Sequence, residues 1–303
     1  MSELQEQFDD ITVQAYELRK AEKYEEALKL VQPFADKGLP IAQHIVATFH
    51  YWGEGVPEDL IKASEWLQKA AAQGCVESLS MLGHQTIYGV GIPKNEKLGE
   101  DLLLQAGAKN DGYAYYILGR YFHNQGDRFK ASGYYVLGVN LDNRDCMRGR
   151  AEMHMESKSY KDALDLYVQA LKLGCIDSTF NAATMFDNGL GCEKNLELAY
   201  MLYKTASEAG NFMATHNLGT FYYNGKHVQQ DKQKAFEFYL KGAEQNVGIS
   251  QHCIGLMYFN GDLTQDLDVA LSWLNKSLEN GYEDSARFIA EIQKIKDKNF
   301  VEH

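Results

Sequence analysis

The sequence of 303 residues has few prolines and a deficit of positive charge. Only four prolines occur, and proline is the residue least compatible with a helix interior, so the composition favours a mostly helical chain. The 30 lysines and arginines are outnumbered by 42 aspartates and glutamates, which gives a formal net charge of −12. Nucleic acids and anionic membranes attract basic proteins. We therefore expect neither as a partner.

Long apolar runs and paired cysteines are also lacking. No stretch approaches the ~20 apolar residues needed to span a bilayer, so we expect no membrane insertion. The first residues, MSELQEQFDD, lack the basic and then apolar pattern of a secretion signal. The five cysteines form no CxxC pair and are odd in number, which favours a reducing compartment. We predict a cytoplasmic protein, and without an HExxH motif we expect no metal and no other cofactor.

A periodic pattern is the main positive feature of the sequence. Small residues recur at intervals of 36 positions in two series, Ala42, Ser78 and Ala114, then Ser178, Ala214 and Ser250. Such self-similarity indicates a stack of identical supersecondary units, because no unit of this size can bury its apolar face alone. A stack of this kind more often displays a binding surface than a reaction centre. We therefore expect a binding protein and no enzyme.

Each repeat has the pattern of two helices joined by a glycine-containing turn. Between residues 41 and 74, the segment Gly53-Glu54-Gly55-Val56-Pro57 separates two helical patterns, and its glycines permit the positive φ that ends a helix. The second pattern places apolar residues on one face at spacings of three and four, namely Ala63, Trp66, Leu67, Ala70 and Ala71. We predict a helix hairpin in which Trp66 fills the space between successive hairpins.

The later copies match the same pattern in phase. The residues that carry it are Leu82, Gly83, Gly89 and Gly91; Ala183, Gly189, Gly191, Ala199 and Tyr203; Leu218, Gly219, Tyr222, Gly225, Lys234, Ala235, Tyr239 and Ala243; and Gly255, Tyr258, Gly261, Ala270, Trp273 and Lys276. This pattern resembles the Sel-one-like repeat (SLR) family, a relative of the tetratricopeptide repeat. The resemblance implies a right-handed α-solenoid of about eight helix hairpins with a capping helix at its end, and it implies no catalytic residue.

Three units depart from the SLR pattern because they lack the GxG turn and are closer to tetratricopeptide repeats. We predict one α-solenoid domain over residues 1–303. Its parts are a tetratricopeptide-like unit (3–38), SLR units (39–110), two short tetratricopeptide-like units (111–174), SLR units (175–281) and a capping helix (282–298).

The first helix of each hairpin should line a concave groove. Counted from the Ala42-type position, the third, seventh, tenth and eleventh residues are expected to point into it. The partner-binding residues predicted in this way are His44, Tyr51, Trp52, His84, Tyr88, Tyr116, Arg120, His123, Asn124, Arg148, Asn188, His216, Tyr223, Asn224, His252, Phe259 and Asn260. Aromatic and amide side chains suit protein recognition. The alternative is that the aromatic residues only fill contacts between adjacent first helices.

Two subsets of the groove residues have alternatives of their own. Asn124, Asn188, Asn224 and Asn260 form a ladder of amides that could pair with the backbone of an extended peptide; three of them precede a glycine and could instead terminate their helices. Five of the seven arginines lie between Arg120 and Arg150. They could bind carboxylates or phosphates, or they could form an ordinary solvated surface.

The sequence therefore predicts a scaffold or adaptor without enzymatic activity that binds a protein or peptide partner in the concave groove. The oligomeric state is left open, with a monomer favoured. One alternative is a cytosolic immunity or regulatory protein that inhibits a toxin or enzyme, because an acidic repeat protein could cover a basic active site. Bacterial proteins of this resemblance include immunity factors. The remaining alternative is an enzyme with a convergent site in the groove.

Overall fold

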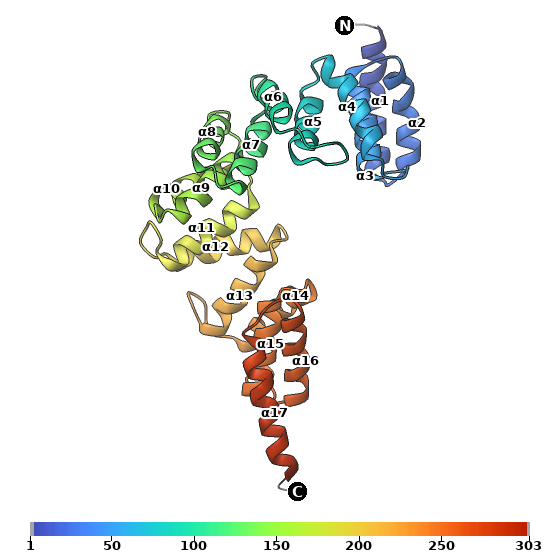
Figure 1. Ribbon diagram of the computed structural model, residues 1–303. Helices are drawn as coiled ribbons and strands as arrows, with labels where there is room; N and C mark the ends of the chain where they lie inside the picture. Colours follow the sequence, from blue (N-terminus) through green and yellow to red (C-terminus); the bar gives the residue numbers. More distant parts are fainter. Residues whose placement is uncertain (1–2, 302–303) are drawn as a thin grey trace. The chain divides into compact units, whose positions relative to one another are not determined.

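The computed structural model describes residues 3–301, with side chains for residues 7–298. This part of the chain contains 17 α-helices and no strand (Figure 1). In chain order they are α1 (Glu3–Lys20), α2 (Tyr24–Asp36), α3 (Pro40–Trp52), α4 (Leu60–Ala72), α5 (Val76–Tyr88), α6 (Glu96–Gly107), α7 (Gly112–Asn124), α8 (Arg128–Val139), α9 (Arg144–Glu156), α10 (Tyr160–Lys172), α11 (Ile176–Asn188), α12 (Leu196–Glu208), α13 (Phe212–Asn224), α14 (Lys232–Glu244), α15 (Gly248–Asn260), α16 (Leu267–Glu279) and α17 (Ser285–Val301).

Within each unit the helices follow one another as hairpins, and successive hairpins pack on each other. In α3/α4, α5/α6 and α15/α16, for example, the two helices of the pair have their closest neighbour in each other, and α17 packs on α16. The predicted all-α solenoid of eight hairpins and a final helix is confirmed. The chain forms two compact units, residues 1–150 and 151–303, whose boundary falls inside α9. Whether they behave as the single domain predicted above stays a prediction.

The hairpin turn shows why the repeat needs its two glycines. Gly53 adopts φ 66° and ends α3 by donating its N–H to the carbonyl of Phe49. Gly55 has φ 69°, and a Cβ there would lie 2.6 Å from the backbone nitrogen of Glu25 in the preceding hairpin. The first glycine therefore reverses the chain, and the second lets the turn pack against the neighbouring repeat.

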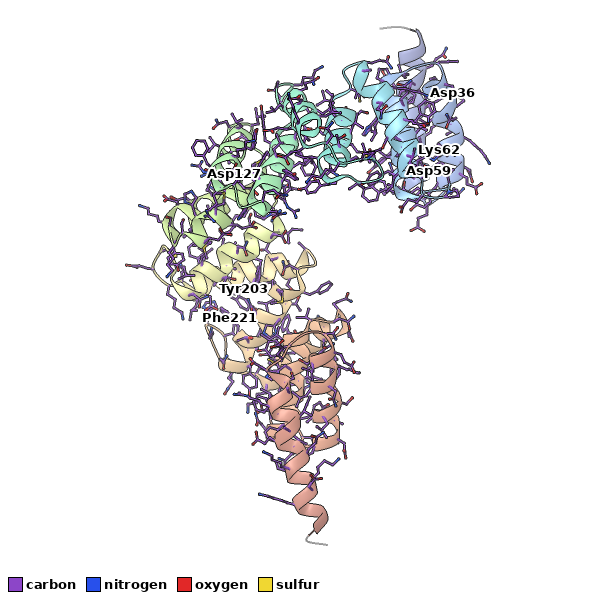
Figure 2. All side chains as sticks on the ribbon, in the orientation of Figure 1. Asp36, Asp59, Lys62, Asp127, Tyr203 and Phe221 are labelled. Atoms are coloured by element: carbon purple, nitrogen blue, oxygen red, sulfur yellow. The ribbon has the colours of Figure 1, made fainter. Side chains whose placement is uncertain are left out.

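The second helix begins with a side-chain cap. Asp59 accepts a hydrogen bond from the backbone N–H of Lys62 at 2.9 Å (Figure 2 labels both residues). Asn95, Asn195 and Asp231 do the same in later SLR hairpins. These caps satisfy backbone donors that a helix start leaves without a partner, so the polar residue at this place in the repeat fixes where each second helix starts.

Small residues allow the two helices of a hairpin to approach closely. Ala42, Ala47 and Ala63 are completely buried, as is Leu67. Trp66 is partly buried and packs against the apolar clusters on both sides of its hairpin. This is the place between successive hairpins that the sequence pattern predicted for it.

The second unit has an aromatic core. Tyr203 of α12 and Phe221 of α13, both labelled in Figure 2, are almost fully buried with ring centroids 5.8 Å apart. The Tyr203 hydroxyl donates to Thr184 Oγ1 at 3.1 Å, so its polar end is satisfied. Burial of this kind joins hairpin α11/α12 to hairpin α13/α14. The core of the unit therefore depends on contacts between repeats.

The hairpins predicted as tetratricopeptide-like have shorter turns than the SLR hairpins. Residues 125–127 connect α7 to α8, whereas residues 53–59 connect α3 to α4.

Among residues 3–301, no helix is both long and apolar enough to cross a membrane.

Candidate protein-binding surface

In the first unit, three successive first helices enclose a pocket of about 440 Å³. Helix α3 contributes Tyr51 and Trp52, whose rings lie edge to face with centroids 4.6 Å apart. His84 contributes from α5, and Tyr113 contributes from the first turn of α7. The Trp52 side chain is 62% exposed and Tyr113 is 51% exposed, so the aromatic surface of this pocket is open to solvent.

Two carboxylates lie in the same pocket. Glu77 is near the start of α5, where its carboxylate is hydrogen-bonded to its own backbone N–H and to the Cys75 thiol at 3.3 Å, and these bonds lower its pKa. Asp111 caps α7 by accepting from the Tyr113 N–H at 2.9 Å and also accepts the hydroxyl of Ser80. No ion pair involves either carboxylate within the described part of the chain. The pocket is therefore aromatic and negatively charged.

An aromatic row continues from the pocket along the first helices. The His84 ring lies 4.8 Å from the Tyr88 ring, which in turn meets Tyr121 edge to face at 5.3 Å. Burial and the charge of Arg120 lower the pKa of His84, so its imidazole is neutral near pH 7. Tyr88 remains partly exposed. The predicted residues of α5 thus lie in one continuous surface with those of α3.

The predicted arginines of this unit surround one tyrosine. Tyr116 is buried, and its hydroxyl accepts from the guanidinium of Arg148 at 2.7 Å and from that of Arg120 at 3.5 Å. Arg148 also pairs with Asp145 at 3.5 Å. Arg120 is exposed, whereas Arg148 of α9 is partly buried and bonded to Tyr116 of α7. Of the two arginines, Arg120 is therefore the more accessible, and its role in binding a partner stays a prediction.

Three of the predicted histidines bind a serine of the next repeat. His44 Nδ1 lies 3.0 Å from Ser78 Oγ, and His216 Nδ1 lies 3.1 Å from Ser250 Oγ. His252 Nδ1 lies 2.8 Å from Ser285 Oγ, so the same bond recurs twice in the second unit. All three serines are fully buried at the small-residue position of their repeat or its equivalent in α17. In the structure these histidines connect repeats, and their role in binding a partner stays a prediction.

Burial suppresses the charge of these histidines. Burial lowers the pKa of His216 to about 4, and it is the main cause of lower pKa values for His44 and His252. At neutral pH each imidazole is therefore neutral, with one ring nitrogen as donor and the other as acceptor. Protonation would place a charge in these desolvated sites, so it would destabilise the connection between repeats.

In the second unit, a smaller cavity of about 240 Å³ brings together three predicted residues, Tyr223, Asn224 and Asn260. The Tyr223 hydroxyl donates to Asp262 at 2.6 Å, and this bond together with burial raises the pKa of the phenol to about 12. Asn224 and Asn260 are exposed. The lining offers hydroxyl and amide groups, with no carboxylate and no basic side chain.

The predicted asparagines occupy the last position of their helices. Glycine takes the left-handed position after three of them, at Gly189, Gly225 and Gly261, with φ between 67° and 71°. Asn188 donates its side-chain amide to the carbonyl of Thr184 at 2.8 Å within its own helix. The asparagines therefore do not end the helices by entering the left-handed region themselves. Their service as a peptide-binding ladder stays a prediction.

The remaining predicted residues lie apart from these pockets. His123 is half-buried and Asn124 exposed at the end of α7. Phe259 packs against Phe288 of α17, with ring centroids 6.2 Å apart. Within residues 3–301, no group of three or more histidine, cysteine, aspartate or glutamate side chains could hold a metal ion.

The sequence-based counting missed Glu77, Asp111 and Tyr113. Glu77 and Tyr113 directly precede the small residues from which the positions were counted, so they fell outside the series. A signal was nevertheless present, because Glu77, Ser80, His84 and Tyr88 follow one another at spacings of three and four, which is one face of a helix. In α5 the candidate surface therefore extends one turn further toward the start of the helix.

Similar solved structures are themselves repeat proteins. A protective antigen of uropathogenic Escherichia coli with an SLR fold matches at TM-score 0.71 and 24% identity over 88% of this chain, which spans only 59% of the antigen. A Sel1 repeat protein from Oxalobacter formigenes matches at 0.68 and 22% identity over 94% of this chain and 90% of that one. Yeast Tom70 matches at 0.54 and 14% identity over 92% and 61%. These likenesses show the fold.

The family is shown by the repeats themselves. The family model of the Sel1 repeat matches residues 40–75, 76–111, 112–132, 176–211, 213–247 and 249–282. These matches cover more than half of the chain. Five of them coincide with hairpins predicted as SLR units, and the match at residues 112–132 covers α7 and the start of α8. The chain belongs to the Sel1 repeat family.

Proposed function

We propose that this protein is a non-catalytic scaffold that binds a protein or peptide partner along the faces of its first helices. The pocket of the first unit carries the proposal. Its lining comes from three consecutive hairpins, and it exposes rigid aromatic side chains beside polar groups. Exposed aromatic residues in a concave surface supply contact area at low entropic cost and are frequent anchors of protein interfaces.

The proposal includes a cytoplasmic location and the absence of catalysis. All five cysteines carry free thiols, which agrees with a reducing compartment. The serines bonded to His44, His216 and His252 are fully buried, so these pairs are inaccessible to a substrate and poorly placed for catalysis. An inhibitor of a toxin or enzyme is a special case of the same function, and it would be recognised by loss of the partner's activity on binding.

The experiment uses two side chains of equal exposure on opposite helices of one hairpin. Trp52 lies on the first helix and is 62% exposed, whereas Ile61 lies on the second helix and is 63% exposed. The full chain, Trp52→Ala and Ile61→Ala would each be used to capture proteins from native lysate, with quantitative mass spectrometry. We expect Trp52→Ala to lose the specific partner and Ile61→Ala to retain it. Loss with Ile61→Ala alone would overturn the proposal.

A further inference from the structure

We propose that the pocket of the first unit is a subsite for a basic side chain, a guanidinium or an ammonium group, presented by the partner. This inference rests on the proposed function and adds the chemistry of the bound group. It differs from the preference for apolar segments that exposed aromatic residues alone would suggest, because two carboxylates lie among those residues.

The three tryptophans of the chain differ in how their rings are used. Lys69 lies over the Trp66 ring at 4.1 Å, and Lys276 lies over the Trp273 ring at 4.7 Å. Each of these rings thus holds a cation from its own helix. Trp52 is the exposed tryptophan, and no cation of the described residues lies over its ring. Its π-face is open for a cation from outside.

The carboxylates determine the sign of the charge that the pocket favours. Glu77 and Asp111 each keep acceptor capacity beyond the hydrogen bonds already described. The lining contains no lysine or arginine, and its one histidine, His84, is neutral at pH 7. Among the lining residues, a cation entering the pocket would therefore meet two negative groups and no positive one, in partly desolvated surroundings that strengthen the attraction. Arg120, whose charge acts on His84, lies outside the lining.

The size and the overall charge agree with this occupant. A volume of about 440 Å³ accommodates a long side chain together with part of its backbone. The net charge of −12 would steer a basic partner toward the protein. Another cavity, in the second unit, is lined by Lys204, Lys234 and Lys241 along with glutamates. The net charge of this lining is positive, so this cavity does not compete for a basic side chain.

The test uses single amino acid derivatives, so that it needs no identified partner. The Nα-acetyl amides of arginine, lysine and citrulline, in which the side chain is unmodified, would be titrated into the ¹⁵N-labelled full chain. Citrulline has nearly the shape of arginine without the charge. The indole N–H resonance of Trp52 reports binding at the site, and those of Trp66 and Trp273 serve as internal controls. The Trp52→Phe variant assigns the Trp52 resonance, because that signal is lost from its spectrum.

We expect the Trp52 resonance to shift and saturate with a cationic derivative, at least about tenfold more tightly than with citrulline, while Trp66 and Trp273 stay unchanged. The arginine and lysine arms distinguish a guanidinium from an ammonium site. Glu77→Gln should weaken binding at least about fivefold, whereas Glu65→Gln, an exposed carboxylate on the second helix, should leave it unchanged.

Equal binding of citrulline and arginine would overturn the proposal, as would the absence of a shift at Trp52 or equal affinity in Glu77→Gln. If Glu77→Gln does not fold, the comparison of arginine with citrulline on the unaltered chain still decides. Partner capture that depends on Trp52, combined with no preference for the cation, would leave the scaffold function standing and remove only the subsite.

Discussion

The two units use the same repeat but treat charge differently on their first helices. In the first unit, Glu77 and Asp111 face an open aromatic pocket and form no ion pair within the described residues. In the second unit, Asp187 near the end of α11 and Asp262 just after α15 are paired internally. Lys226 lies 3.2 Å from Asp187, and Lys232 pairs with Asp262. The repeat therefore supplies the scaffold, and the residues at a few positions decide whether a carboxylate stays available to a partner or forms an ion pair within the protein.

The histidine connections differ in the same direction. The second unit has two histidine–serine bonds between repeats, at His216 and His252, and both imidazoles are buried. The first unit has one such bond, at the half-buried His44. Among the described residues, more histidines of the second unit than of the first therefore join repeats. We infer that the second unit is specialised for structure and the first unit for binding.

The largest expected effect is on the aromatic core of the second unit. Tyr203→Ala removes a buried ring that joins two hairpins and should lower the free energy of unfolding by about 3–5 kcal/mol. Tyr16→Ala, at a ring that is 64% exposed in the first unit, should change it by less than about 0.5 kcal/mol. Chemical denaturation of both variants measures the difference. Equal losses would contradict the assigned core.

Acid should weaken the second unit through its buried histidines. The folded pKa of His216 is about 4, while an unfolded histidine titrates near 6.5. Between these values the unfolded chain binds more protons, so stability is complete above about pH 6.5. It should fall by up to about 1.4 kcal/mol per pH unit as the pH drops toward 4.

The control for this pH dependence is His216→Gln, which cannot be protonated. Its stability should decrease less steeply than that of the unaltered chain between pH 6.5 and pH 4, as measured by urea denaturation at several pH values. An identical slope in the variant would show that His216 does not contribute.

The smallest effect concerns the asparagines of the second unit. Asn224 and Asn260 are exposed, and glycine occupies the left-handed position after each helix. Replacing either by alanine should therefore change the free energy of unfolding by less than about 0.5 kcal/mol. Thermal denaturation measures this, and a loss above about 1 kcal/mol would restore the helix-terminating role. A loss of partner affinity at unchanged stability would support the ladder.

The hairpins could be predicted from sequence because their determinants are local. Gly53 and Gly55 specify the turn, and Asp59 specifies the start of the second helix, whatever the neighbouring repeats contain. The candidate site was predicted in part. Tyr51, Trp52 and His84 were placed on the groove face, but Glu77 and Asp111 were missed because they lie just before the positions that were counted.

The contacts of the histidines could not be predicted from the sequence of one repeat. Whether His216 faces a partner or a neighbour depends on Ser250 in the next hairpin, 3.1 Å away. A buried bond of this kind depends on how two units stack, and a sequence pattern gives only the face on which each side chain lies. The recurrence of serine at the small-residue position was the available signal, and it became interpretable once the stacking was known.

We propose that partners bind the first-helix face, with the first unit as the main binding region. The most direct measurement is the dissociation constant of a captured partner for the full chain, Trp52→Ala and Ile61→Ala, together with the stability of each protein. We expect Trp52→Ala to lose about 2 kcal/mol of binding free energy, chiefly through faster dissociation, at nearly unchanged stability. Ile61→Ala should bind like the unaltered chain. Unchanged binding by Trp52→Ala, with loss in Ile61→Ala, would contradict the account.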